Sequence, residues 1–232
     1  MPTRLIPFIK VFVHLACFAP FADLLLRFHR DDLGADPVNT ITHFTGDWAL
    51  YILLLSLAVT PVRRLHPRLA NLIRFRRMLG LYAFFYATLH LATYLFLFSG
   101  YDVPTAWAGA QSGHFGEVFT QFKLVWPTIW DDIHKRRFVQ VGFASWVILL
   151  ALALTSPQFM LRWMGGKPWQ RLHRLVYIAA AMAVIHFWWL VKTGVRTPWK
   201  VTAVLTVLLL ARVAYTVLKR RAKTAVPQPV IR

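Results

Sequence analysis

Five of the nine histidines lie in or at the edge of long apolar stretches, where an ionisable side chain is costly and marks a candidate functional site, and the spacing of three of them is informative. His90 follows Arg77 by 13 residues, and His186 follows His173 by 13 residues. In a helix, 13 residues span about 20 Å. The spacing therefore predicts that His90 and His186 lie at one level of a helix bundle, and that His173 lies at the level of Arg76 and Arg77.

Paired imidazoles at one level indicate haem ligation. Histidines on facing helices hold haem iron from both sides, and an apolar gap between helices suits the porphyrin. Such a haem transfers electrons and leaves no iron position for a substrate. Other metal sites fit less well, because Cys17 is the single cysteine and a di-iron bundle site would need Glu with E-x-x-H. For each histidine, a helix–helix hydrogen bond or a cavity-lining role stays open.

The helix that contains His173 and His186 raises one geometric difficulty. Thirteen residues at 100° each place the two side chains about 140° apart on an ideal helix. A π-bulge or a tilt is therefore predicted in this segment.

The elements that position these histidines are six apolar spans of about 20 residues, the length that crosses a bilayer. The chain has 232 residues, of which 57% are apolar. No repeat or linker divides it, so we expect one all-α domain over residues 1–232, a six-transmembrane-helix bundle with haem between the third and fifth helices. The first span is expected to be a retained helix. The spans are predicted at 8–28, 43–61, 78–99, 139–157, 172–191 and 198–218.

The chain has a formal net charge of +18, and its basic residues are distributed along the sequence as in a membrane protein. This distribution argues against a nucleic-acid partner. Residues 62–77 contain six Arg and no acid, whereas residues 29–42 contain three Asp and one Arg. The positive-inside rule then predicts that both termini are cytoplasmic. Guanidinium groups also suit haem propionates, a flavin phosphate or a quinone headgroup, and Arg76 and Arg77 are the candidates for such contacts.

Residues 100–138 form the one sizeable segment outside the spans, on the predicted outer side. Aromatic residues interleaved with charge suggest a surface-lying segment or a partner platform, and an ordinary solvated loop is the alternative. No G-x-G-x-x-G pattern accompanies a strand and a helix, so NAD(P)H is not expected to bind in a domain of this chain.

The sequence resembles the MsrQ (YedZ) family, the haem-binding membrane subunits of the periplasmic protein-methionine-sulfoxide reductase system, within the ferric-reductase-like transmembrane group. The resemblance rests on LGADPV (33–38), HFTGDWAL (43–50), TPVRRL (60–65), RFRRMLGLYAFFYATLHLATY (74–94), SWVILLALALTS (145–156), WQRLHRLVYIAA (169–180) and IH (185–186).

The resemblance implies an inner-membrane protein with b-type haem, one or two, and with FMN also attributed to the family. Its haem-linked histidines fall on His90, His173 and His186. The larger group has two histidines on each haem-binding helix, whereas this chain has Arg76 or Arg77 at the inner position of the third. The implied role is to pass electrons from the quinone pool, or from a cytosolic flavin reductase, to a periplasmic molybdopterin subunit that reduces methionine sulfoxide in proteins.

The chain is thus expected to be an electron-transfer subunit and not a complete enzyme. Two other functions stay open. One is a self-contained membrane cytochrome or ferric reductase. The other is a transporter in which buried histidines relay protons or metal ions.

Overall fold

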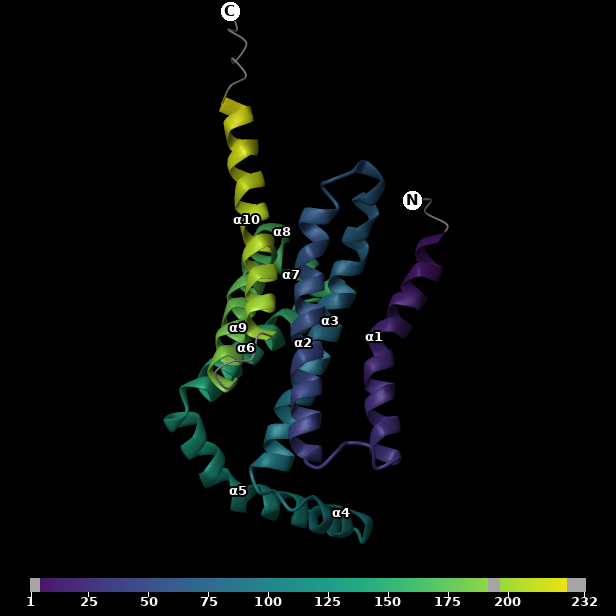
Figure 1. Cartoon of the computed structure of the whole chain (residues 1–232), viewed down its shortest axis with the longest axis vertical. Helices are drawn as coiled ribbons and strands as arrows, with labels where there is room; N and C mark the ends of the chain where they lie inside the picture. Colours follow the sequence, from purple (N-terminus) through teal and green to yellow (C-terminus); the bar gives the residue numbers. More distant parts are fainter. Residues whose placement is uncertain (1–4, 192–196, 225–232) are drawn as a thin grey trace, which may run out of the picture.

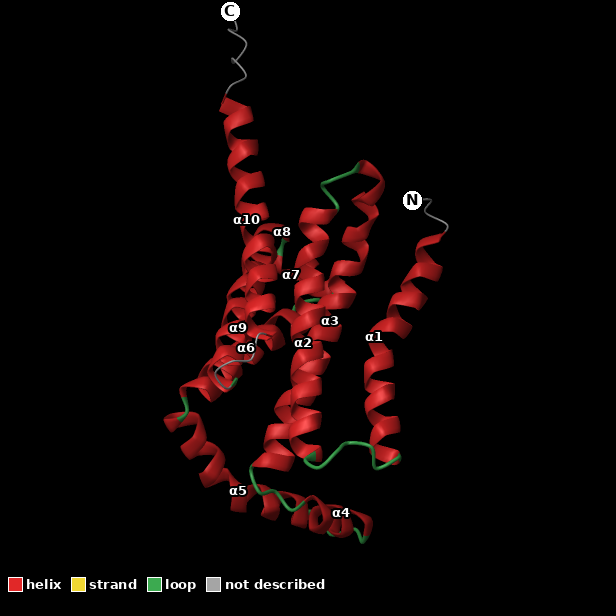
Figure 2. Cartoon of the chain, viewed as in Figure 1, coloured by secondary structure: helices red, strands yellow, loops and turns green. Residues whose placement is uncertain are grey.

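The computed structural model describes residues 5–191 and 197–224, and in these ranges the regular structure is entirely helical (Figure 2). Six helical stretches are long and apolar enough to cross a membrane, which confirms the predicted fold class of a six-span helical bundle. They are α1 (Ile6–His29), α2 (Pro37–Val62), α3 (Ile73–Thr93) with its extension η3 (Tyr94–Phe98), α6 (Arg137–Leu154), α9 (Val176–Leu190) with the preceding turns, and α10 (Thr197–Thr224).

Shorter helices connect these spans. They are η2 (Pro67–Leu72), α4 (Val103–Gln111), α5 (Gly116–Lys135), α7 (Gln158–Met164), α8 (Gly166–Leu172) and η4 (His173–Leu175). The predicted spans agree with the structure except at their ends: α2 begins at Pro37, not at residue 43, and α3 begins at Ile73, not at residue 78. The difference arises because the first turns of these helices are polar. In α2, Asp36 caps the helix by accepting a hydrogen bond from the Asn39 amide, and Pro37 stands in the first turn, where proline is favoured.

The bundle has two distinct ends (Figure 1). The α2–α3 connection, the start of α1 and the end of α10 point to one end, which we call the basic end because residues 62–77 lie there. Helices α4 and α5 lie across the opposite end, which we call the α5 end. The extreme termini, for which a cytoplasmic location is predicted, lie outside the described residues.

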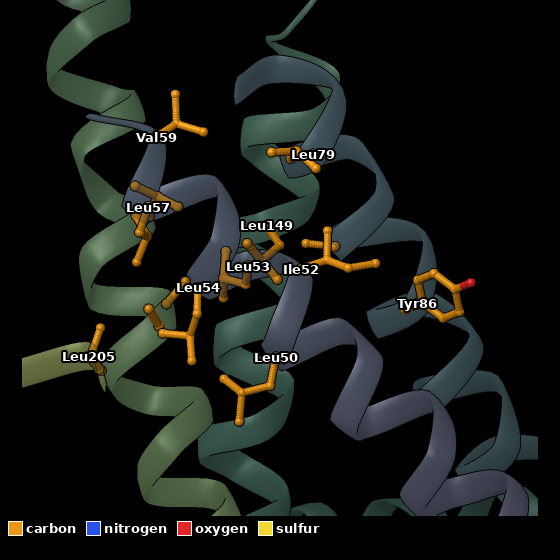
Figure 3. Packing of buried hydrophobic residues seen from close by; sticks show 14 of the residues in the cluster. Leu50, Ile52, Leu53, Leu54, Leu57, Val59, Leu79, Tyr86, Leu149 and Leu205 are labelled. Carbon is orange, nitrogen blue, oxygen red and sulfur yellow. The ribbon is translucent and has the colours of Figure 1, made fainter. Parts of the chain in front are cut away.

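Helix α2 supplies much of the buried core. It packs along α3, and α6 packs along α9. Leucines of α2 interdigitate with side chains of α3, α6 and α10, as Figure 3 shows for Leu53, Leu79, Leu149 and Leu205. This packing brings α3 and α9 close enough for His90 and His186 to be in contact.

The sequence predicts a π-bulge or a tilt between His173 and His186, and the π-bulge does not occur. The helix instead starts with a 3₁₀ turn, η4, so its irregularity lies at His173 itself and the remainder is regular α-helix. A π turn does occur at the end of α3, where η3 follows Thr93. Proteins use such turns to re-aim side chains near functional sites.

Candidate functional site

His90 of α3 and His186 of α9 meet inside the bundle. Their ring centroids are 6.0 Å apart, and the ring planes are nearly perpendicular at 84°. Residues 96 positions apart in the sequence are thus in contact, as predicted from equal helical spacing. Their role as metal ligands remains a prediction.

Each imidazole is held by a backbone carbonyl of a neighbouring helix. His90 Nδ1 lies 3.0 Å from the carbonyl oxygen of Thr42 on α2, and His186 Nδ1 lies 2.8 Å from that of Phe138 on α6. A carbonyl only accepts hydrogen bonds, so each Nδ1 carries the proton and donates it. Nε2 then holds the lone pair in both rings, which is the tautomer that a metal-binding histidine needs.

Two glycines make room for the two rings. A Cβ atom added at Gly46 of α2 would lie 3.1 Å from the His90 ring, and one added at Gly142 of α6 would lie 2.7 Å from His186 Nδ1. Any larger residue at Gly142 would displace the imidazole. The two rings can therefore occupy these positions only because residues 46 and 142 are glycines.

The separation of the two rings is compatible with one iron ion between them. A metal–imidazole bond is about 2 Å long, and a ring centre lies about 1 Å further from the metal than its nitrogen, so two ligands in line have centroids about 6 Å apart. The observed 6.0 Å agrees with that distance. Perpendicular planes do not prevent axial ligation, because each ring binds through its own nitrogen.

His173 lies in a different environment towards the basic end. Its Nε2 is 3.1 Å from the Thr155 hydroxyl, and its ring stacks on Trp169 with 3.9 Å between centroids. The side chain lines a cavity that also contains Arg76 and Arg77, so the predicted proximity of these three residues is present. None of the other described residues around this cavity is a histidine.

The basic cavity, as we call this space, has a volume of about 500 Å³ and lies between α2, α3, α6, α9 and α10. Part of its wall is apolar and is formed by Leu53, Leu149 and Leu152. Its lining residues also include six arginines and no acidic residue. The arginines come from the α2 end, α3, η4 and α10. They are Arg63, Arg64, Arg76, Arg77, Arg174 and Arg212.

Three polar atoms on this cavity have no hydrogen-bond partner among the described residues: Thr60 Oγ1, Arg63 Nε and Tyr177 Oη. Thr60 is 4% exposed. Leaving a buried polar group unpaired is costly, so each such atom calls for a ligand or water. Six cations and three unpaired polar atoms around an apolar-walled space suit a planar ligand with an anionic group.

Several residues of the two sites escape sequence reasoning. Thr42 and Phe138 contribute backbone carbonyls, which no side-chain pattern reveals. Gly46 could have been found as a glycine in an apolar helix, although such glycines often serve helix packing alone. Arg212 sits in the last span, far from the other arginines in sequence, and only the packing of α10 brings it to the cavity.

Comparison with known proteins supports a haem protein. The family described as "Ferric reductase like transmembrane component" matches residues 45–184, which include both His90 and His173. Three similar proteins are named protein-methionine-sulfoxide reductase heme-binding subunit MsrQ. That of Xanthomonas axonopodis pv. citri is 45% identical over 86% of this chain and 83% of its own length. The protein of Xanthomonas euvesicatoria pv. vesicatoria is 43% identical over 95% of this chain and 93% of its own length. The protein of Herminiimonas arsenicoxydans is 42% identical over 94% of this chain and 89% of its own length.

The chain belongs to the MsrQ family. Membership and the six apolar helices support a multi-pass membrane protein with a haem electron-transfer role. They also fit a subunit of a methionine-sulfoxide reductase system more closely than a complete enzyme. The expectation from the quoted motifs is thereby confirmed at the level of the family.

Proposed function

We propose that this chain is a transmembrane electron-transfer subunit that binds b-type haem through His90 and His186. Electrons enter at the basic cavity, from membrane quinol or from a cytosolic flavin reductase. They leave at the α5 end to a periplasmic molybdopterin-containing subunit that reduces methionine sulfoxide in oxidised proteins. The names of the relatives support a role in a methionine-sulfoxide reductase system. The chemistry of the two sites supports the direction of electron transfer, from the basic cavity to the α5 end.

The observation that carries the proposal is the imidazole pair. Its centroids are 6.0 Å apart, and both Nδ1 atoms are engaged by carbonyls. When bound, haem supplies a one-electron carrier in an apolar interior that otherwise offers none. The chain fixes the two rings through carbonyls of α2 and α6, keeps each Nε2 free of its proton, and leaves room for the rings at Gly46 and Gly142. With both of these imidazoles bound to the iron, the site would favour electron transfer over substrate chemistry.

The basic cavity is proposed as the place where electrons enter. Arg76 and Arg77 on α3 are assigned to the anionic group of the ligand there, with His173 beside them. Haem propionates, an FMN phosphate and a quinone headgroup all suit this chemistry. A second bis-histidine haem at this level would need a ligand opposite His173, and the described cavity residues provide no second histidine.

The orientation follows from charge. The basic end carries the arginine-rich connection between α2 and α3, and such connections stay on the cytoplasmic side. We therefore place the basic cavity towards the cytoplasm and the α5 end towards the periplasm of a bacterial inner membrane. The extreme termini are then cytoplasmic.

The test is a reduced-minus-oxidised absorption spectrum of the purified chain and of its histidine variants. We expect b-haem bands in the wild type, loss of haem in His90→Ala and His186→Ala, and retention in the control His114→Ala. His114 is an exposed histidine that bonds Ser112 outside the spans. His173→Ala is expected to keep the haem of the pair but to slow reduction by quinol or flavin reductase.

Two results would contradict the proposal. A wild-type spectrum without haem bands would favour the histidine-relay transporter. Haem that is reoxidised by ferric ion, but not by methionine sulfoxide in the presence of a periplasmic catalytic subunit, would favour a self-contained ferric reductase.

A further inference from the structure

Helix α5 carries an uncovered row of aromatic side chains along one side. Phe115 precedes the helix, and the other four follow at intervals of four, three, four and four residues, which places all five within about 80° of the helix circumference. Phe115 is 66% exposed, Phe119 69% and Trp130 53%. The rings of Phe122, Trp126 and Trp130 follow one another at 5.7 and 6.1 Å. We call these five residues the aromatic row.

Packing and hydrogen bonds set the rotation of α5 about its own axis. Val125 and Ile129 are buried against η3 and α4 on a neighbouring side of the helix. Asp132 accepts a hydrogen bond from the Tyr94 hydroxyl at 2.9 Å. The Tyr101 hydroxyl donates to the Val118 carbonyl at 3.1 Å. These contacts hold α5 on the outer end of α3, with the aromatic row on the neighbouring, exposed side of the helix.

The side of α5 opposite the aromatic row is polar. Glu117, Thr128 and Lys135 lie there and are exposed, and Lys135 pairs with Asp131 at 2.8 Å. Leu124 is the apolar exception on this side, at 66% exposure. A helix with an aromatic side and a charged side matches the pattern of helices that lie in a membrane surface.

The connections of α5 place one of its ends directly beside the start of a span. A single residue, Arg136, separates its last residue from α6, whose apolar stretch begins at Arg137. Trp130 lies seven residues before Arg137, a helical distance of about 10 Å. At its other end the segment continues from η3, which closes the α3 span at Phe98. Figure 1 shows α5 leaving the start of α6 and running beneath the end of the bundle.

We propose that the aromatic row is an interfacial anchor that inserts into the headgroup–acyl boundary of the outer leaflet. Lipid is the occupant because the row begins within a few residues of a span end, at the depth where Trp is favoured in membrane proteins. The exposed Lys123 and His134 border the row at the edge where headgroup phosphates lie. The anchor would keep α4 and α5 close to the membrane across the α5 end. This inference does not depend on haem binding.

The experiment measures the depth of a fluorophore at two positions of the full chain in lipid nanodiscs. Cys17 is first replaced by Ala, and single cysteines are introduced as Phe119→Cys in the row and Leu124→Cys on the opposite side. The two native side chains are exposed to nearly the same extent, 69% and 66%. Each cysteine carries an environment-sensitive label, and the nanodiscs contain lipids that are spin-labelled near the headgroup.

We expect lipid quenching at position 119 to be at least about twofold stronger than at position 124, with the reverse order for aqueous iodide. Equal quenching at both positions would overturn the proposal. So would protection of position 119 that arises only when a periplasmic catalytic subunit is added, because the row would then be a protein-docking surface. If Phe119→Cys fails to fold, Trp126→Cys reports on the same row.

Discussion

Replacing Gly142 by Ala tests the imidazole pair without removing either histidine. The new Cβ would lie 2.7 Å from His186 Nδ1, 2.8 Å from Cε1 and 3.2 Å from Cγ. Ordinary carbon contacts start near about 3.5 Å, so the ring would have to move by roughly 0.7 Å or more. Both Gly142 and the carbonyl that holds the ring, that of Phe138, belong to α6. The ring therefore cannot retreat from the methyl group and keep its 2.8 Å hydrogen bond.

The expected loss combines two effects. Overpacking of a tight site costs about 1–3 kcal/mol, and the hydrogen bond contributes about 0.5–1.5 kcal/mol. Removing the partner that orients a metal-bound histidine lowers metal affinity about 10–100-fold. We accordingly expect haem affinity in Gly142→Ala to fall by one to two orders of magnitude.

Haem titration of the purified apoprotein, followed by absorption and electron paramagnetic resonance, measures this loss. Gly46→Ala provides a graded comparison, because its Cβ would lie 3.1 Å from the His90 ring and a small shift would relieve the contact. Gly166→Ala is the control, with no atom within 4 Å of the added Cβ. We expect the largest loss of haem affinity in Gly142→Ala, a smaller loss in Gly46→Ala and no loss in Gly166→Ala. Unchanged haem affinity and spectrum in Gly142→Ala would refute the reasoning that this ring position binds iron.

Two further predictions concern stability and pH. The Tyr86 hydroxyl accepts a hydrogen bond from the Phe21 amide at 3.0 Å and donates one to the Cys17 carbonyl at 2.8 Å. Tyr86→Phe should therefore destabilise the chain by about 1–3 kcal/mol. Thermal unfolding in detergent measures this loss, and an unchanged unfolding midpoint would contradict the prediction. The backbone and hydroxyl bonds from Thr105 hold the pKa of Asp102 below its usual range. The cap therefore stabilises α4 above the ordinary carboxyl pKa and loses that contribution as pH falls through the lowered value. Amide protection in α4 should show this pH dependence in the wild type and lack it in Asp102→Ala.

The spans could be predicted from sequence because each apolar stretch has the length of a bilayer and each end is marked by polar residues or proline. The ends of α2 and α3 were misplaced because capping and polar first turns extend a helix beyond its apolar part. Asp36 shows this for α2, where its carboxylate starts the helix six residues before the apolar run. Hydropathy measures the membrane-embedded length, and helix length is a different quantity.

The pairing of His90 with His186 was predictable for a similar reason. Rise per residue is nearly constant, so equal counts from Arg77 and from His173, which line the same cavity, give equal depth. Rotation is less predictable than depth, because one irregular turn changes the direction of every side chain before it. The turn at His173 is 3₁₀ and not π, and that difference could not be read from an apolar run with no proline or glycine.

The two levels of the bundle differ in how their histidines are held, and this difference bears on their chemistry. His90 and His186 each engage a carbonyl through Nδ1, which leaves Nε2 of both rings available to a metal. His173 engages the Thr155 hydroxyl through Nε2 itself. The Thr155 hydroxyl donates its one proton to the Ala151 carbonyl at 2.7 Å, so it accepts the bond from His173 Nε2. His173 therefore carries a proton on Nε2 and is either neutral or, with a second proton on Nδ1, a cation, whereas the carbonyls at the imidazole pair require the proton on Nδ1. The first arrangement suits a permanent metal ligand. The second suits a residue that binds or releases a proton beside an anionic ligand, as reduction by a quinol requires.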